Sequence, residues 1–251
     1  MKSETLAAKA VEKTLRGKVQ KQTFPPLLEI PQKRGIPTFH TASTATGYSF
    51  LGGLTGADPN RRNWLPLSPA LTPNSTESYS GGAFALVRAG DFSRAEELLK
   101  EATKRYPPQH TLFNNVSLPS IRAAIALGTK KPDEAIQQLQ GAAGYDFTHP
   151  PDILDGGTMY YRGVAYLELH SGNEAAEQFQ KLLDNPGTVS IGILRPLAHL
   201  GLARAYAITG DKDKSLAQYR EFLALWKNAD PDLRILREAK TEYEKLNKFT
   251  P

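Results

Sequence analysis

The chain has 251 residues, of which 40% are hydrophobic and 23% are charged, and none is a cysteine. This composition fits one folded domain with a less ordered end, and it excludes disulfides and thiolate metal sites. No apolar run in the sequence is long enough for the core of a signal peptide or for a membrane span. We therefore expect a cytoplasmic protein, unless the natural start lies upstream.

The first 75 residues differ from the rest in charge and composition. They contain ten lysines and arginines against four acidic residues. Residues 1–20 can form a basic amphipathic helix able to bind an acidic membrane or nucleic acid, but a solvated leader helix is the favoured interpretation, because one short basic helix has little specificity. Residues 23–74 contain eight prolines, which predict a linker or extended arm. We expect some of its apolar residues to dock on the remainder of the chain.

From residue 76 onward, side-chain size recurs with a period of forty residues. A small residue is followed by a large one three positions later, by a small one nine further on, and by a large one four beyond that. The four units start at Ala83, Ala123, Gly163 and Ala203. This period, with two helices in each unit, is typical of a stacked helical repeat. Small residues allow two helices to approach closely, so we expect Gly163 at the helix contact of the third unit.

Capping and breaking residues divide the units into helices. The expected pairs are 76–89 with 92–105, 118–127 with 133–140, 155–169 with 173–183, and 196–209 with 212–226, followed by a last helix at 230–246. Gly90 is expected to end the first helix, whereas Pro119 and Pro231 are expected in opening turns. The pattern predicts an all-α domain over residues 76–251. We expect it to fold without residues 1–75, because repeat contacts are local in sequence.

The size pattern resembles that of tetratricopeptide repeats. The best match is AFALVRAGDFSRAEELLKEATKRYP, which begins at Ala83, whereas the second unit departs because Ala126 stands where a tyrosine is usual. The period is about six residues longer than the usual ~34. The resemblance implies a right-handed helical-repeat solenoid of four helix pairs plus a C-terminal capping helix, preceded by an irregular N-terminal arm.

A second resemblance covers roughly residues 83–246. The runs SLPSIRAAIAL, YYRGVAYLELHSG and LAHLGLARAYAITGDKDKSLAQYREFLALWKNADPDLRILREAKTEYEKL are similar to the C-terminal repeat region of large serine/threonine protein kinases from soil bacteria of the acidobacterial kind. The chain lacks the glycine-rich loop and the HRD and DFG triplets of a kinase domain. The resemblance therefore implies an interaction module or a sensor region, which would lie outside the cytoplasm if it belonged to a membrane-anchored kinase.

The tetratricopeptide resemblance also implies a binding surface, because the first helix of each pair lines a concave face. The groove positions carried over to this sequence are Phe84, Arg88, Ala124, Tyr160, Val164, Glu168, Arg204 and Ile208. We expect this face to bind an extended or helical segment of a protein or peptide partner, with no nucleic acid partner. For each position the alternative is an ordinary solvent-facing residue. The alternative function is that of a regulatory region whose kinase domain is absent from this chain.

The chain shows no convincing catalytic or metal-binding pattern. Asp146, His149, Asp152 and Asp155 are spaced by threes, but Pro150 and Pro151 would break a helix there, so a loop of turn-forming residues is favoured. His170 and His199 are expected in helices, without a partner histidine four residues away. We therefore assign no catalytic residue, metal ligand or cofactor and expect a protein that is not an enzyme. The oligomeric state is left open.

Overall fold

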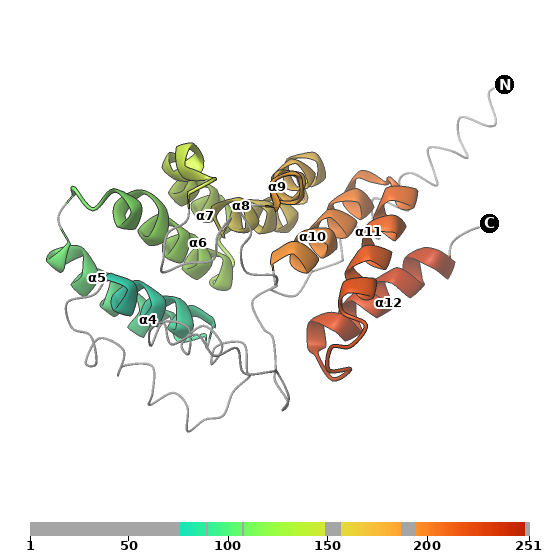
Figure 1. Ribbon diagram of the computed structural model, residues 1–251, viewed down its shortest axis with the longest axis horizontal. Coiled ribbons are helices and arrows are strands. Elements are labelled where there is room, and N and C mark those ends of the chain that lie inside the picture. Colours follow the sequence, from blue (N-terminus) through green and yellow to red (C-terminus); the bar gives the residue numbers. More distant parts are fainter. Residues whose placement is uncertain (1–75, 89, 107, 149–156, 187–193, 249–251) are drawn as a thin grey trace.

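The computed structural model describes residues 76–88, 90–106, 108–148, 157–186 and 194–248 (Figure 1). The leader helix and proline-rich arm predicted for residues 1–75 lie outside this part. So do the middle of the loop between the second and third units and most of the loop between the third and fourth. The domain boundary expected at residue 76 stays a prediction.

The described residues form an all-α helical-repeat solenoid, as predicted (Figure 1). Four pairs of helices are followed by a single last helix. The α-helices are α4 (Thr76–Arg88), α5 (Phe92–Arg105), α6 (Leu118–Gly128), α7 (Pro132–Leu139), α8 (Gly157–Glu168), α9 (Gly172–Asp184), α10 (Leu194–Thr209), α11 (Lys212–Leu225) and α12 (Arg234–Lys248). The two helices of each pair pack against each other, and the first helices α4, α6, α8 and α10 pack successively along the array.

Two helix starts differ from the prediction by more than two residues. The helix that contains α6 begins earlier, with a π-helix η2 (Phe113–Ser117) in which the Leu118 amide donates to the Phe113 carbonyl. Pro119 therefore lies inside a longer helix, and the wider π turn accommodates its ring, which would crowd the carbonyl four residues earlier in a regular α-helix. Helix α12 begins at Arg234.

The residues before α12 form a turn instead of its first helical turn. In this turn the Asp232 amide donates to the Asp230 carboxylate at 2.9 Å, and the Leu233 amide donates to the Asp230 carbonyl at 3.1 Å. Pro231 lies within it. An aspartate that bonds the backbone two residues on favours a turn over a helix start, which explains the late beginning of α12.

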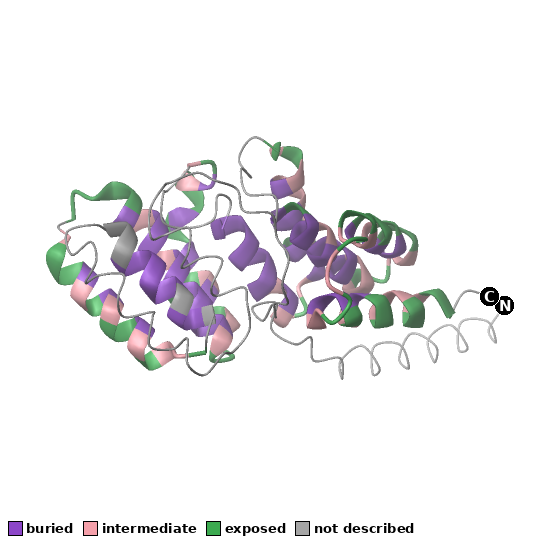
Figure 2. Ribbon diagram, turned by 60° about the horizontal axis from the view of Figure 1, so that its bottom comes forward, coloured by how far each residue is buried: buried purple, intermediate pink, exposed green. Residues whose placement is uncertain are grey.

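The size pattern corresponds to the packed interior. Three of its four positions are buried in every unit, namely Ala83, Ala95 and Leu99; Ala123, Ala135 and Leu139; Gly163, Ala175 and Phe179; and Ala203, Ser215 and Tyr219. The hydroxyl of Ser215 donates to the Ala203 carbonyl at 2.7 Å, so this polar group is satisfied inside the core. In Figure 2, buried residues lie where the helices meet and exposed residues lie on their outward sides.

The turns within the four pairs repeat the same backbone geometry. Gly90, Lys130, His170 and Gly210 are spaced by forty residues and have φ angles of 76°, 62°, 58° and 83°. In each turn the next amide donates to the carbonyl five residues earlier, at 2.8 to 2.9 Å. This is the Schellman ending of a helix, in which glycine is preferred because it has no Cβ. His170 was expected in a helix, but it lies in a left-handed turn.

We expect His170→Gly to raise the free energy of unfolding. The left-handed conformation costs a residue with a side chain about 1–2 kcal/mol, and the greater freedom of glycine in the unfolded chain returns about 0.4–1 kcal/mol of that. The net gain should be about 0.5–1 kcal/mol, measured by urea unfolding. Gly210→Ala is the matched control and should destabilise. A destabilised His170→Gly variant would show that the imidazole makes contacts worth more than the strain.

Candidate functional site

The predicted groove positions fall into two rows along the first helices, plus Tyr160. The inner row consists of Phe84, Ala124, Val164 and Arg204, which are spaced by forty residues. All four are buried, and so is Tyr160. The last-turn row consists of Arg88, Gly128, Glu168 and Ile208, of which Gly128 was not among the predicted positions. Gly128, Glu168 and Ile208 are half-buried, and the side chain of Arg88 lies outside the described part.

Aromatic contacts inside the protein involve several of the predicted groove residues. The rings of Phe84 in α4 and Tyr161 in α8 meet edge to face, with centroids 5.9 Å apart. Tyr160 packs in the same manner against Phe179 of α9 at 6.0 Å. Helix α6 packs against both α4 and α8 and contributes the short side chain of Ala124. The inner row of the first three units thus forms part of the hydrophobic core.

Arg204 is an internal ion-pair partner, because its side chain is 0% exposed and pairs with Glu242 of α12. Its Nε donates to Glu242 Oε2 at 2.9 Å, and its Nη2 donates to Oε1 at 3.0 Å. The Tyr219 hydroxyl donates to Glu242 Oε2 at 2.8 Å. Burial on its own would lower the pKa of Arg204, but the attraction and hydrogen bonds of Glu242 raise it overall. Burial, followed by the charge of Glu242, raises the pKa of Tyr219 well above its ordinary value, so the phenol stays neutral.

The last-turn row offers the accessible part of the predicted face. Glu168 pairs with Lys130 of the preceding unit at 3.2 Å, and the lysine side chain is 55% exposed. This pair joins the ends of α6 and α8 at the surface. Ile208 occupies the same position one unit later and packs partly on the core. A half-buried apolar side chain one unit along from an ion pair at the surface can contact a partner without any rearrangement of the core.

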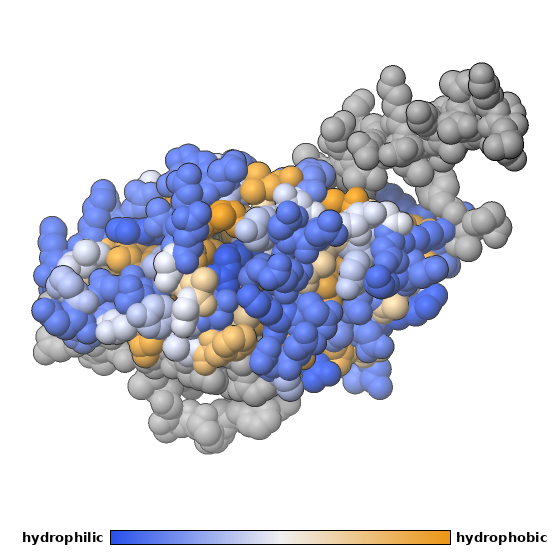
Figure 3. Space-filling model, turned by 90° about the horizontal axis from the view of Figure 1, so that it is seen from above, coloured by the Kyte–Doolittle hydropathy of each residue, from blue (hydrophilic) through white to orange (hydrophobic). Residues whose placement is uncertain are grey.

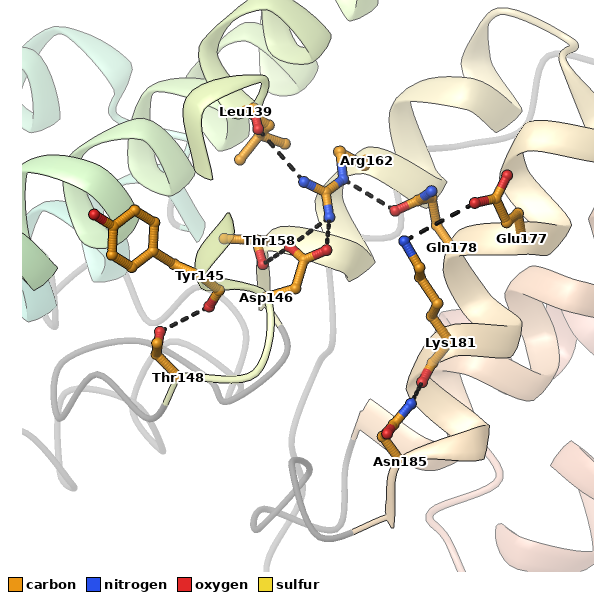
Figure 4. Close-up of polar contacts among 10 residues, drawn as sticks. All are labelled: Leu139, Tyr145, Asp146, Thr148, Thr158, Arg162, Glu177, Gln178, Lys181 and Asn185. Atoms are coloured by element: carbon orange, nitrogen blue, oxygen red, sulfur yellow. Dashed lines mark hydrogen bonds and ion pairs between the residues drawn. The ribbon is translucent and has the colours of Figure 1, made fainter. Parts of the chain in front are cut away.

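A second buried polar cluster, not predicted from the sequence, joins α7, α8, α9 and the loop after the 3-10 helix η3 (Gly141–Tyr145) (Figure 4). Arg162 donates to the Asp146 carboxylate, to the Gln178 side chain at 3.0 Å and to the Leu139 carbonyl at 3.4 Å. Thr158 donates to Asp146 at 3.0 Å. The group ties the third unit to the end of the second.

Asp146 belongs to the set of residues spaced by threes, and in the structure it has a structural contact. Its carboxylate holds the guanidinium of Arg162, with both side chains buried. His149, Asp152 and Asp155 lie outside the described residues. Within the described ranges, no group of three or more histidines and acids could hold a metal ion. His199 has its Nδ1 2.7 Å from the amide oxygen of Gln218 and lies half-buried between α10 and α11.

Seen from above, polar side chains cover most of the visible surface of the described helices, and apolar residues form scattered patches (Figure 3). None of the described helices is long and apolar enough to cross a membrane. Stacked helix pairs with a buried small-and-large pattern and a polar exterior define a helical-repeat protein of the kind that presents an extended surface to other molecules.

A family model for the tetratricopeptide repeat matches residues 83–153 and 160–230, which together are more than half of the chain. The chain belongs to this family, whose repeats generally mediate interactions between proteins. Each match covers about two of the four units. No curated protein and no solved structure matches the chain significantly. The comparisons support the first resemblance seen in the sequence and give no support to the second, to kinase C-terminal regions.

Proposed function

We propose that this chain is a non-enzymatic protein-interaction module that binds a peptide or protein segment across the last-turn row and the turns beside it. The tetratricopeptide repeats are the observation that carries the proposal. The inner row is already occupied by contacts within the chain, so we restrict the binding surface to the predicted positions in the last turn of each first helix. A partner would meet Ile208 as an apolar anchor and the Lys130 and Glu168 pair as polar neighbours.

This proposal determines which residues should be substituted in a binding experiment. The predicted groove positions include two arginines, Arg88 and Arg204, whose charges could be reversed if both faced a partner. Arg204 is paired with Glu242 inside the protein, so its reversal would report on folding and not on binding. Glu168 and Ile208 are better probes, since both are half-buried and tolerate substitution more readily than core residues.

The test compares the double variant Glu168→Arg/Ile208→Glu with Ala217→Glu, which adds a charge at an exposed position of α11. Proteins captured from an extract of the source cells are compared between the two variants and the natural protein. We expect the natural protein and the control to retain a common partner that the double variant loses. Its affinity for the double variant should fall at least about tenfold, or about 1.4 kcal/mol. Equal affinity for all three proteins, at unchanged helix content, would refute binding at this row.

The regulatory alternative assigns the same surface to the control of a kinase domain absent from this chain. It rests on sequence resemblance and has no structural feature that favours it. A kinase reading frame continuous with this one would support it. If the last-turn row then bound that kinase domain, the kinase would be the partner of the interaction module.

A further inference from the structure

Helix α4, the first described helix of the array, is buried on every side. Successive residues of an α-helix are about 100° apart, so any four in a row point around the whole axis. Its described residues, all of them buried, are Tyr79, Ser80, Gly81, Gly82, Ala83, Phe84, Leu86 and Val87. The side chains of Glu77 and Arg88, the two charged residues of α4, lie near its ends and outside the described part. Such an all-round burial is expected of a helix with neighbours on all sides.

The described neighbours of α4 do not surround it. The helices that pack closely against it are α5 and α6, and one ring contact comes from Tyr161 of α8. Helix α5 is the partner of α4 in the same unit, and α6 and α8 belong to the units that follow, so no described helix precedes α4 in the array (Figure 1). A central helix such as α8 packs against its partner α9, and also against α6 and α7 of the unit before it and α10 of the unit after it.

The other end of the array shows what an end helix looks like when it meets water. Helix α12 buries Ile235, Leu236 and Ala239 and exposes a charged face. The exposed face includes Arg237, Lys240, Glu244 and Lys245. In Figure 2 this helix, which ends beside the label C, shows that exposed face in green. A solenoid needs such a polar outer face at each end, whereas the described middle of α4 is buried all round.

Two consecutive glycines in α4 also indicate that another segment of chain approaches this helix closely. Gly81 and Gly82 lie in the middle of α4, where glycine is less favourable to a helix than alanine. Both are buried. At each of these two positions the missing side chain lets another backbone approach the helix closely. These positions suit an extended chain that lies along the helix.

We propose that residues 64–71 of the N-terminal arm cover α4 at Gly81 and Gly82 and act as the N-terminal cap of the solenoid. This segment, WLPLSPAL, supplies one tryptophan and three leucines, and its two prolines favour an extended backbone. Four residues lie between Leu71 and Thr76, so the five Cα-to-Cα steps allow Leu71 to lie up to about 18 Å from the start of α4. Helix α4 has 13 residues and is about 20 Å long. The segment is thus long enough to lie along α4. It is joined to the N-terminus of this helix, which is the first described helix of the solenoid.

This cap contradicts the independence of residues 76–251 that repeat locality suggests. It makes the arm part of the folded domain and ties the stability of the first unit to residues before it. In a dimer, a second copy of the chain could cover α4 instead of residues 64–71. The experiments below distinguish these two arrangements.

Fluorescence tests the cap in the full chain, which has two tryptophans. Trp226→Phe leaves Trp64 as the single reporter and keeps an aromatic ring beside Phe222. We expect blue-shifted Trp64 emission and acrylamide quenching several-fold weaker than in urea, at a concentration where light scattering shows a monomer. Trp64 emission and quenching equal to those of the unfolded chain would overturn the proposal, as would shielding that disappears when a dimer dissociates.

Substitutions locate the contact on α4. Gly81→Arg should expose Trp64 to quencher, whereas Gly141→Arg should not, because nothing lies within 4 Å of a Cβ built at Gly141. Leu67→Ser/Leu71→Ser should speed hydrogen exchange of the α4 amides at least about tenfold while α8 to α10 stay protected. Leu27→Ser is the matched control within the arm. Unchanged exchange in the Leu67/Leu71 variant, or Trp64 shielding indifferent to Gly81→Arg, would place the segment elsewhere and refute the cap.

Discussion

Glu242→Ala is expected to lower the free energy of unfolding by about 3–5 kcal/mol, because it leaves the fully buried guanidinium of Arg204 without its counterion. The loss should begin at the C-terminal end, since Glu242 lies on α12 and both its partners lie on the last helix pair. Urea unfolding measures the total loss. Hydrogen exchange should show faster opening of α12, α11 and α10 than of α4 to α7.

Two further variants separate the ion pair from general damage to α12. Glu244→Ala removes an exposed carboxylate two residues away on the same helix and should change stability by less than about 0.5 kcal/mol. The triple variant Arg204→Met/Tyr219→Phe/Glu242→Leu replaces the whole polar group by apolar side chains of similar size. It should recover most of the loss, because a buried ion pair rarely outperforms a well-packed apolar set. Equal effects of Glu242→Ala and Glu244→Ala would show that Arg204 is not held by this pair.

Gly163→Leu and Gly201→Leu are expected to destabilise the protein, since both glycines face the same ring. A Cβ at Gly163 would lie 2.7 Å from Cζ of Phe179, and a Cβ at Gly201 would lie 2.5 Å from it. The ring is 0% exposed and is held between α8 and α10, so it cannot turn aside from either residue. Overpacking should cost about 1–3 kcal/mol, against a gain of up to about 1 kcal/mol from removing a glycine from a helix interior.

Gly141→Leu is the control, because a Cβ there meets nothing within 4 Å. Denaturant midpoints compare the three variants. Adding Phe179→Leu should reduce the penalty of either core substitution, since a smaller side chain frees the space that the new one needs. A Gly163→Leu protein as stable as its parent would show that Gly163 does not lie at a close helix contact in the third unit.

Local signals in the sequence were sufficient for most of the helices. Helix α5 has the predicted bounds, because Asp91 caps its start through the Arg94 amide at 3.3 Å and Pro108 follows shortly after its end. The small-and-large pattern located the core in every unit, and Gly163 lies at a tight contact as expected. These features depend on residues close together in the chain, whose preferences are readable from their order.

Local signals also failed where two of them competed. Pro119 predicted a helix start, yet the helix extends through it by means of the π turn. The residues around Pro231 satisfied the pattern of a helix start, yet the side chain of Asp230 stabilises a turn there. His170 matched the helix pattern, yet the Schellman turn places it in the left-handed region, which sequence order favours mainly for glycine.

The predicted groove positions illustrate what the tertiary structure decided. Repeat register correctly put Phe84 and Arg204 at equivalent places on first helices, 120 residues apart and three periods along the chain. It could not show that Phe84 would meet the ring of Tyr161 or that Arg204 would pair with Glu242, 38 residues later. Register defines the side of a helix on which a residue lies. Whether that side meets solvent depends on the distance and angle between successive units, which the packing of alanines, glycines and rings across the array determines.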